Sequence, residues 1–167
     1  MSTKPVNLYP LIDKSSMDKI NKLHPNVRED VKKIVQEINT RLKGRAKVRI
    51  AQGYRSFEEQ NKLFAKGRTV KGAIVTNAKG GQSNHNYGFA VDIVLIIDGK
   101  IASWDTKADW DNDKKSDWME CVEVFKENDW SWGGDWKSFK DMPHFDKKGF
   151  DNWRVMIKLK RDKEEYV

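Results

Sequence analysis

The sequence predicts an α+β fold, in which a small antiparallel sheet has helices packed on one side. Three observations predict it. Apolar residues recur at helical spacing over 27–42, whereas apolar and charged residues alternate over 46–52. A short apolar run at 93–97 ends at Asp98-Gly99, a dipeptide typical of hairpin turns. Helical and strand periods in one chain, with a hairpin signal between two strands, favour helices on an antiparallel sheet.

Length and composition indicate one globular domain. The 167 residues can bury a core, and 34% charged and 38% hydrophobic residues are ordinary for a globular protein. No repeat or linker divides the chain, so we predict a single domain over 1–167, with its core at about 25–146 and an extension at 147–167. No apolar run approaches the roughly 18 residues of a membrane-spanning helix, and we expect no membrane insertion.

Short-range signals place three helices and a strand before residue 67. In order, they are a short helix capped by Ser15 or Ser16, an amphipathic helix ending at Gly44, a strand over 46–52, and a helix opened by the capping-box pattern Ser56-Phe57-Glu58-Glu59. Arg55 therefore lies between a strand and a helix, where its side chain can point into a cleft. A surface salt bridge is the other interpretation of this residue.

The second half begins with a glycine-rich loop at 67–82, which we expect to wall a groove because long structureless loops are usually functional. A strand over 89–97 and its hairpin partner over 100–104 follow, and then a helix over 116–128. The segment after residue 147 fits either a terminal strand or a helix.

Charge and cysteine content limit the partners. The net charge is +7, which attracts acidic partners, but the lysines are spread along the chain and no nucleic-acid-binding motif occurs, so nucleic acid is not expected. An anionic cell wall fits better once the metal-ligating pattern described below is admitted, and solubility alone is the other explanation. Cys121 is the only cysteine, which excludes an internal disulfide, and we expect it to be a small core residue.

Two of the three histidines stand near carboxylates. His85 precedes Asp92 by seven residues across a turn at Gly88, and His144 follows Asp141 by three. Zinc takes nitrogen and oxygen ligands in a tetrahedron, and a catalytic zinc keeps one position open. We therefore predict zinc ligation by His85, Asp92 and His144, with Asp141 accepting a proton from water. On these four residues alone, a chance spacing is the competing explanation.

The surrounding pattern resembles a family of zinc peptidases. The motif Ser83-x-His85-x-x-Gly88-x-Ala90-x-Asp92, followed by Trp132-Gly133-Gly134-Asp135-Trp136 and Asp141-x-Pro143-His144-Phe145, is similar to the LAS peptidases, which include D-Ala-D-Ala-cleaving and hedgehog-like domains. From about Val48 to Phe145 the chain looks most like the phage and bacterial L-alanyl-D-glutamate peptidases. The resemblance implies a hedgehog/DD-peptidase-like fold and zinc-dependent hydrolysis of the peptidoglycan stem peptide.

The resemblance also implies roles outside the metal pattern. Arg55 would hold a substrate carboxylate or the oxyanion, which its planar fork suits. Ser83, Gln60 and Trp136 match positions that contact substrate, support the site or line the groove. Cleavage between L-Ala and D-Glu is the favoured reaction. A D-Ala-D-Ala carboxypeptidase or dipeptidase, and a non-catalytic zinc-stabilised wall-binding module, are the alternatives.

The N-terminal residues Met1–Pro5 lack the apolar region of a signal peptide. Together with the resemblance, this favours a monomeric phage endolysin that is released from the host cytoplasm to the wall by a holin-type route. A bacterial protein in the cytosol fits this observation equally well.

A second acidic pattern follows the predicted hairpin. Five acids, Asp109, Asp111, Asp113, Asp117 and Glu120, occupy offsets 1, 3, 5, 9 and 12, as the calcium ligands of an EF-hand loop do. Lys114 departs from that pattern, because glycine normally makes the sharp turn at the sixth position. Calcium as a structural clip is one interpretation, and an acidic turn that caps the next helix is the other.

Overall fold

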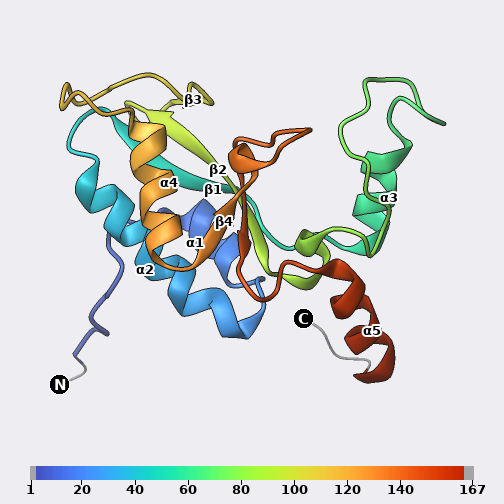
Figure 1. Ribbon diagram of the computed structural model, residues 1–167. Coiled ribbons are helices and arrows are strands. Elements are labelled where there is room, and N and C mark those ends of the chain that lie inside the picture. Colours follow the sequence, from blue (N-terminus) through green and yellow to red (C-terminus); the bar gives the residue numbers. More distant parts are fainter. Residues whose placement is uncertain (1–2, 164–167) are drawn as a thin grey trace.

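The computed structural model describes residues 3–163, with an antiparallel sheet at its centre (Figure 1). Within that range the sheet has five strands: β1 (Ala46–Gln52), β2 (Ala90–Ile97), β3 (Ile101–Ser103), β4 (Trp130–Trp132) and β5 (His144–Lys147). The strand order is β1-β2-β5-β4, and β3 pairs with the far end of β2, beyond β5. β2 is therefore the shared partner of three strands, which explains its nearly unbroken apolar sequence.

The register of β2 decides which residues face each other at the site. Asp92 lies opposite Gln52 on β1 and opposite His144 on β5. The pairing with β1 shifts between Ile50 and Gln52, at the end of the strand that leads to Arg55. Directly opposed residues hold their Cβ atoms about 5 Å apart, so the sheet itself brings Asp92 and His144 within reach of one ion.

Three helices pack against the sheet: α1 (Lys14–Ile20), α2 (Pro25–Arg41) and α4 (Asp117–Glu127). α2 shows why, since its apolar positions all lie on its buried stripe. Two further helices, α3 (Phe57–Ala65) and α5 (Trp153–Lys163), stand at the other end of the molecule, beyond the short 3₁₀ turn η1 (Asn84–Tyr87) (Figure 1). A second 3₁₀ turn, η2 (Gly133–Asp135), follows β4.

The α+β prediction, with an antiparallel sheet and helices, is confirmed. The core joins α1, α2 and α4 to β1, β2 and β5, and it also takes in Ile20, Leu23 and Met156 from outside 25–146. Residues 1–2 and 164–167 of the predicted domain lie outside the described residues. Cys121 is fully buried in this core, as expected, and burial raises the pKa of its thiol.

Several predicted boundaries were wrong for identifiable reasons. Asp13, and neither Ser15 nor Ser16, caps α1, because its carboxylate accepts from Ser16 N at 2.8 Å while the Ser16 hydroxyl accepts from Ile50 N. α2 ends at Arg41 and not at Gly44. Gly44 serves a close approach instead, since a Cβ there would lie 2.5 Å from the Trp110 carbonyl oxygen.

The remaining local predictions need only small changes. Ser56 caps α3 by accepting from Glu59 N, and the helix ends at Ala65. The hairpin turn has Asp98 and Gly99 at φ 53° and 70°, the left-handed conformations that such a turn requires. The segment after residue 147 contains helix α5, and not a strand.

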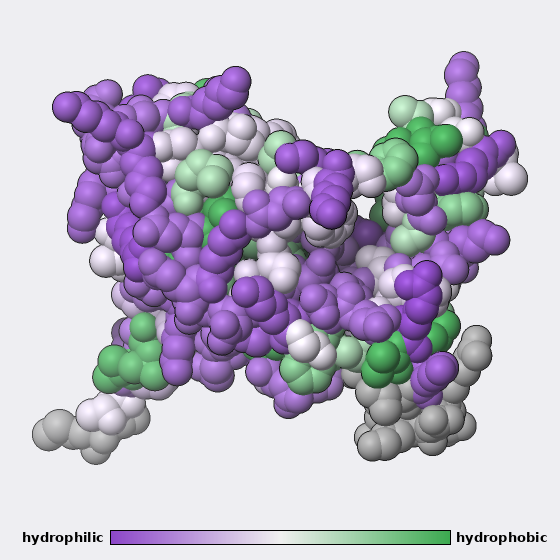
Figure 2. Space-filling model, viewed as in Figure 1, coloured by the Kyte–Doolittle hydropathy of each residue, from purple (hydrophilic) through white to green (hydrophobic). Residues whose placement is uncertain are grey.

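The surface is hydrophilic over most of the face in Figure 2. A hydrophobic group gathers at the upper right, on the loop that follows α3, where Val70, Ile74 and Val75 are exposed. Among the described residues no helix combines the length and apolarity needed to cross a membrane.

Candidate metal centre and active site

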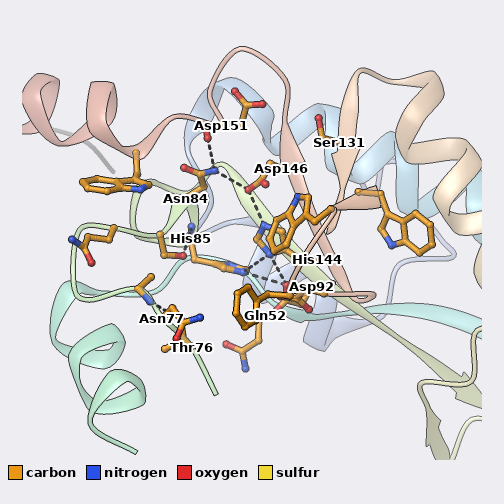
Figure 3. Close-up of a pocket in the computed structure, with 18 of the residues that line it drawn as sticks. Gln52, Thr76, Asn77, Asn84, His85, Asp92, Ser131, His144, Asp146 and Asp151 are labelled. Atoms are coloured by element: carbon orange, nitrogen blue, oxygen red, sulfur yellow. Dashed lines mark hydrogen bonds and ion pairs between the residues drawn. The ribbon is translucent and has the colours of Figure 1, made fainter. Parts of the chain in front are cut away.

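Three elements bring the predicted ligands together at the end of the sheet. His85 comes from η1, Asp92 from β2 and His144 from β5 (Figure 3). Asp92 Oδ1 lies 3.2 Å from His85 Nε2 and 3.1 Å from His144 Nδ1, and the two ring nitrogens are 3.2 Å apart. The three atoms thus form a nearly equilateral triangle, with both imidazoles buried.

The hydrogen bonds of the two imidazoles determine where their lone pairs point. His85 Nδ1 lies 2.7 Å from the carbonyl oxygen of Gly53, which can only accept, so Nδ1 carries the proton. His144 Nε2 lies 2.8 Å from Asp146 Oδ1 and donates to it in the same way. In neutral rings the two inner nitrogens then present lone pairs to each other and to a carboxylate, and only a cation makes that arrangement favourable.

The cluster fits zinc in ligand type and spacing. Tetrahedral zinc with nitrogen and oxygen ligands at about 2.0–2.1 Å places neighbouring ligand atoms roughly 3.3 Å apart. The observed edges of 3.1–3.2 Å are close to that value. Three protein ligands leave a fourth tetrahedral position for water or substrate, which is the catalytic and not the structural arrangement.

The pKa values of Asp92 and His144 without a metal also indicate that the cluster requires a positive charge. Burial would raise the pKa of Asp92, but His85 and His144 hold it well below its usual range. Burial would lower the pKa of His144, but hydrogen bonds to Asp146 and Asp92 raise it to about 10. A proton therefore occupies the cluster when no metal does, and metal binding must release it.

Local sequence explains why His85 is held in place. The Ser83 hydroxyl caps η1 by accepting from His85 N, and Asn86 completes a capping box. Gly88 ends the turn at φ 75°, where a Cβ would lie 2.4 Å from His24 N. His24 has a structural role, because it caps α2 and its ring stacks on Phe89. Ser83 lines the groove, but its observed hydrogen bond is with the η1 backbone.

Asp141 lies beside the three ligands without joining them. The residues whose ligand atoms lie within 4.8 Å of one another are His85, Asp92 and His144. Asp141 lines the same groove, and its backbone bonds to Gly133 and His144. Burial and the charge of Asp92 raise the pKa of the Asp141 carboxyl, which the two histidines partly oppose. A carboxylate in that position can exchange a proton with a reactant at the open position.

The glycine pair before Asp141 is required by this packing. A Cβ on Gly133 would lie 2.3 Å from the Asp141 carbonyl oxygen, and one on Gly134 would lie 2.2 Å from the Trp132 ring. The Trp132 indole N–H donates to the carbonyl of Met142 at 2.6 Å. The segment Trp132-Gly133-Gly134 thus packs closely against the turn that carries Asp141 and holds it in place.

Arg55 and Gln60 form one unit at the start of α3. Arg55 Nη1 donates to Gln60 Oε1 at 2.9 Å, and the amide of fully buried Gln60 is held in turn by the Ala78 carbonyl. Arg55 lines the groove, whereas Gln60 does not. Burial lowers the pKa of the Arg55 guanidinium, against the opposing charges of Asp92, Glu59 and Asp141. Gln60 therefore orients Arg55 toward the site from behind.

An open groove of about 1800 Å³ contains the cluster. The loop after α3 forms one wall through Ile74–Ala78, as the glycine-rich sequence predicted. Trp136 also lines the groove, with its ring 5.3 Å from the ring of His144. Its lining is of mixed charge: besides Arg55 it includes the cations Lys126, Lys140, Lys148 and Arg154, and besides Asp92, Asp141 and Asp146 it includes the acids Asp135 and Asp151. The groove is therefore wide and polar, with room for an extended ligand that carries charged groups.

Sequence reasoning missed two residues behind His144. Asp146 binds His144 Nε2, and Asn84 Nδ2 donates to Asp146 Oδ1 at 2.9 Å and to the Asp151 carbonyl at 3.0 Å (Figure 3). The signal was present, because residues two apart on a strand face the same side, and Asp146 follows His144 by two on β5. Asn84 had no comparable signal, since its partners are distant in sequence.

The predicted calcium residues lie elsewhere. Asp109, Asp111, Asp113, Asp117 and Glu120 occupy the loop before α4 and its first turns, and none of them lines the groove. Asp111 borders Lys43 and Gly44, next to the start of β1, whereas Asp92 pairs with the end of β1. This acidic cluster is therefore separate from the group formed by His85, Asp92 and His144, which we call the zinc-type centre.

The fold and the cluster together define a zinc-peptidase type of centre, and comparison with known proteins identifies the family. Residues 76–147 match the Peptidase M15 model described as D-alanyl-D-alanine carboxypeptidase. The chain is 48% identical over 126 residues to the peptidoglycan L-alanyl-D-glutamate endopeptidase CwlK of Bacillus subtilis (strain 168), across 72% of this chain and 75% of that protein. The protein belongs to the M15 peptidase family, whose members are zinc-dependent.

A solved structure supports the fold independently. The crystal structure of the Serratia marcescens L-Ala D-Glu endopeptidase ChiX matches with a TM-score of 0.55 at 17% identity, over 86% of this chain and 90% of that chain. At that identity the match shows a shared fold. The expected resemblance to zinc peptidases of this type is thereby confirmed at the level of family and fold.

Proposed function

We propose that this protein is a zinc-dependent peptidoglycan endopeptidase that hydrolyses the bond between L-Ala and D-Glu in the stem peptide. The observation that carries the proposal is the convergence of His85, Asp92 and His144 on one point in a groove, with Asp141 beside them. The 48% identity to a peptidase with that named activity supports the choice of bond.

The chemistry divides between the metal and two side chains. His85, Asp92 and His144 would hold the zinc ion, which would supply a Lewis acid able to polarise a carbonyl and to make water nucleophilic at neutral pH. Asp141 takes the proton from the attacking water and returns it to the leaving amine. Its raised pKa suits both steps, since a stronger acid would accept a proton less readily.

Arg55 supplies a fixed positive charge in the same groove as the three ligands. Its position is set by Gln60, so little reorganisation is needed when negative charge develops on the substrate. The oxyanion of the reaction or the carboxylate of D-Glu is its proposed ligand. The net charge of +7 on the whole chain gives longer-range attraction to an acidic stem peptide.

The matched family model favours one alternative reaction, because its description names D-alanyl-D-alanine carboxypeptidase. Digestion of purified peptidoglycan followed by mass spectrometry separates the two. New N-terminal D-Glu supports the proposed endopeptidase, whereas free D-Ala supports the carboxypeptidase.

A different experiment distinguishes the enzyme from a non-catalytic wall-binding module. Asp141→Ala should keep zinc and lose wall hydrolysis. If zinc binding persists and wall clearing is unchanged, the enzyme proposal fails.

The cellular setting is part of the proposal. The protein acts as a monomer on the wall, without nucleic acid or membrane insertion, and reaches it from the host cytoplasm by a holin-type route during phage lysis. The resemblance to phage peptidases supports this setting. Expression inside a host with and without a holin tests the route, because rapid lysis should require the holin.

A further inference from the structure

The acidic loop before α4 brings five carboxylates close together. Ligand oxygens of Asp109, Asp111 and Asp117 lie within 4.8 Å of one another, and so do those of Asp111, Asp113 and Glu120. Asp111 belongs to both groups, so the five acids form one continuous cluster. Unlike the zinc-type centre, the cluster contains no histidine and offers only oxygen ligands.

Two of these carboxylates are buried with an oxygen that has no partner. Asp117 is 0% exposed and Glu120 is 8% exposed. Asp117 Oδ1 accepts from Trp110 N at 3.1 Å, but Asp117 Oδ2 and Glu120 Oε2 have no hydrogen-bond partner. A buried unpaired carboxylate oxygen is costly, and each of these side chains belongs to one of the two groups of converging oxygens.

Nearby cations form no direct ion pair with the cluster. Among the described residues, no ion pair includes any of the five acids. Lys115 pairs with Glu123, and Lys47 donates its ammonium to the carbonyls of Asn39 and Leu42. Burial and the neighbouring acids raise the pKa of Asp117 to about 6 and that of Glu120 to about 7, as expected for carboxylates that lack a counter-ion.

The backbone has the sharp turn at the sixth position of the pattern, although lysine and not glycine stands there. Lys114, at the sixth position of the pattern, adopts φ 71°, and Asn112 adopts φ 58°. Asp109 accepts from Lys114 N at 2.8 Å and from Asp113 N at 3.2 Å, which wraps the loop around its first carboxylate. Lysine at this position therefore costs some backbone strain, but it does not prevent the loop geometry.

We propose that residues 109–120 bind one Ca²⁺ ion, with Asp109, Asp111, Asp113, Asp117 and Glu120 as side-chain ligands. Calcium takes six to eight oxygen ligands in flexible geometry, which suits five carboxylates spaced in this way. Zinc sites normally include histidine or cysteine ligands, which this cluster lacks, and magnesium keeps several waters in a strict octahedron. The site does not depend on the peptidase assignment.

The position of the loop shows what the ion would do. Glu120 and Asp117 are in α4, which packs on α2 and leads directly into β4 and η2. η2 contains Gly133, whose carbonyl accepts from Asp141 N at 3.1 Å. Calcium would fix the start of α4 and thereby stabilise the wall of the groove without contacting the substrate.

Thermal unfolding of the full-length, zinc-loaded protein tests the proposal. Protein is freed of all metals, one equivalent of zinc is restored, and CaCl₂ is then titrated. The unfolding temperature should rise by roughly 5–10 °C at a calcium concentration about 100 times the dissociation constant, and calorimetry should give one site. The proposal is overturned if calcium neither binds nor raises the unfolding temperature.

A matched pair of variants on α4 locates the ion. Glu120→Gln should abolish the calcium-dependent rise, whereas Glu123→Gln, one turn further on and paired with Lys115, should keep it. Without calcium, Glu120→Gln should be at least as stable as the parent, because it removes a buried unpaired charge. An acidic cluster without an ion site would give only this second result.

Asp113→Asn provides the same test at an exposed ligand, where a folding defect is not expected. It should weaken calcium binding at least tenfold. If Glu120→Gln and Asp113→Asn both bind calcium as the parent does, the ion lies elsewhere and the proposed site is wrong.

Discussion

The zinc-type centre and the acidic loop are both groups of converging ligands, but they are stabilised differently. At the zinc-type centre, each imidazole has its own outer partner, the Gly53 carbonyl for His85 and Asp146 for His144. In the acidic loop, two buried carboxylate oxygens have no partner at all. The first centre is therefore held in position by protein atoms, whereas the second would depend on the ion itself.

This difference follows from where the ligands come from. Asp92 and His144 lie opposite each other in the sheet register, and His85 comes from η1, which packs against β2, so the geometry of the three ligands is fixed by the whole fold. The acids of the loop lie within twelve consecutive residues and repel one another. Removing zinc should consequently leave the fold almost intact, while removing calcium should loosen the loop and the first turns of α4.

His144→Ala should have the largest effect and tests whether the first centre needs all three ligands. Zinc binding should fall by at least about 100-fold, and hydrolysis of purified peptidoglycan should become undetectable. Circular dichroism should still show the parent fold, because the outer partners belong to the protein. If the variant keeps both zinc and activity, the first centre does not need all three ligands.

Asp141→Asn separates catalysis from metal binding. The amide keeps the shape but cannot accept the proton, so turnover should fall by about 10²–10⁴-fold at unchanged zinc content. Asp98→Asn is a suitable control, because Asp98 is exposed and pairs with Arg45. Release of muropeptides, followed by chromatography, measures the difference. A parallel loss of zinc would instead make Asp141 a ligand.

How much of each site the sequence predicts depends on how local its contacts are. The EF-hand spacing of the acidic loop can be read from twelve residues, and the hairpin at Asp98-Gly99 from two. The zinc ligands lie up to 59 residues apart, and the family motifs, more than the spacing, predicted their convergence. Gln60 was expected to support the site, and its contact with Arg55 gives that expectation a structural form.

The errors were made where a distant contact outweighs a local preference. Ser15 and Ser16 are good capping residues, but Ser16 is taken into the core beside β1 and Asp13 caps the helix. Gly44 was predicted to end a helix, but glycine is needed there because the Trp110 backbone approaches it closely. Asp146 and Asn84 were missed because their importance lies in their contact with His144 and with each other.

Asp146→Asn tests whether an outer partner preorganises the zinc-type centre. The amide can present its nitrogen to His144 and disturb the tautomer, so zinc affinity should fall about 10–100-fold. Asp151→Asn is the control, since Asn84 contacts the carbonyl and not the carboxylate of Asp151. Competition with a chromogenic zinc chelator measures affinity without any activity assay. Equal affinities in the two variants would show that the outer hydrogen bond is dispensable.

The smallest effect should be a pH dependence of stability that arises in the acidic loop. Burial and the nearby Asp113 raise the pKa of Glu120 to about 7 in the folded protein, whereas the pKa of a glutamate in an unfolded chain is about 4.3. Below both values the proton is bound in both states, and the stability contribution is fully present. As pH rises through this window, the unfolded chain releases the proton first, and stability is lost until the folded pKa is passed.

Calcium-free protein should therefore unfold at lower urea concentration at pH 8 than at pH 5, and Glu120→Gln should reduce that difference. Saturating calcium should reverse the slope for the parent, because the ion binds the ionised carboxylates and its affinity increases as they lose their protons. The zinc-type centre contributes equally to both variants, so the comparison isolates the loop. Identical slopes for the parent and Glu120→Gln would show that these carboxylates are not strained by their neighbours, and would remove the physical reason for a cation there.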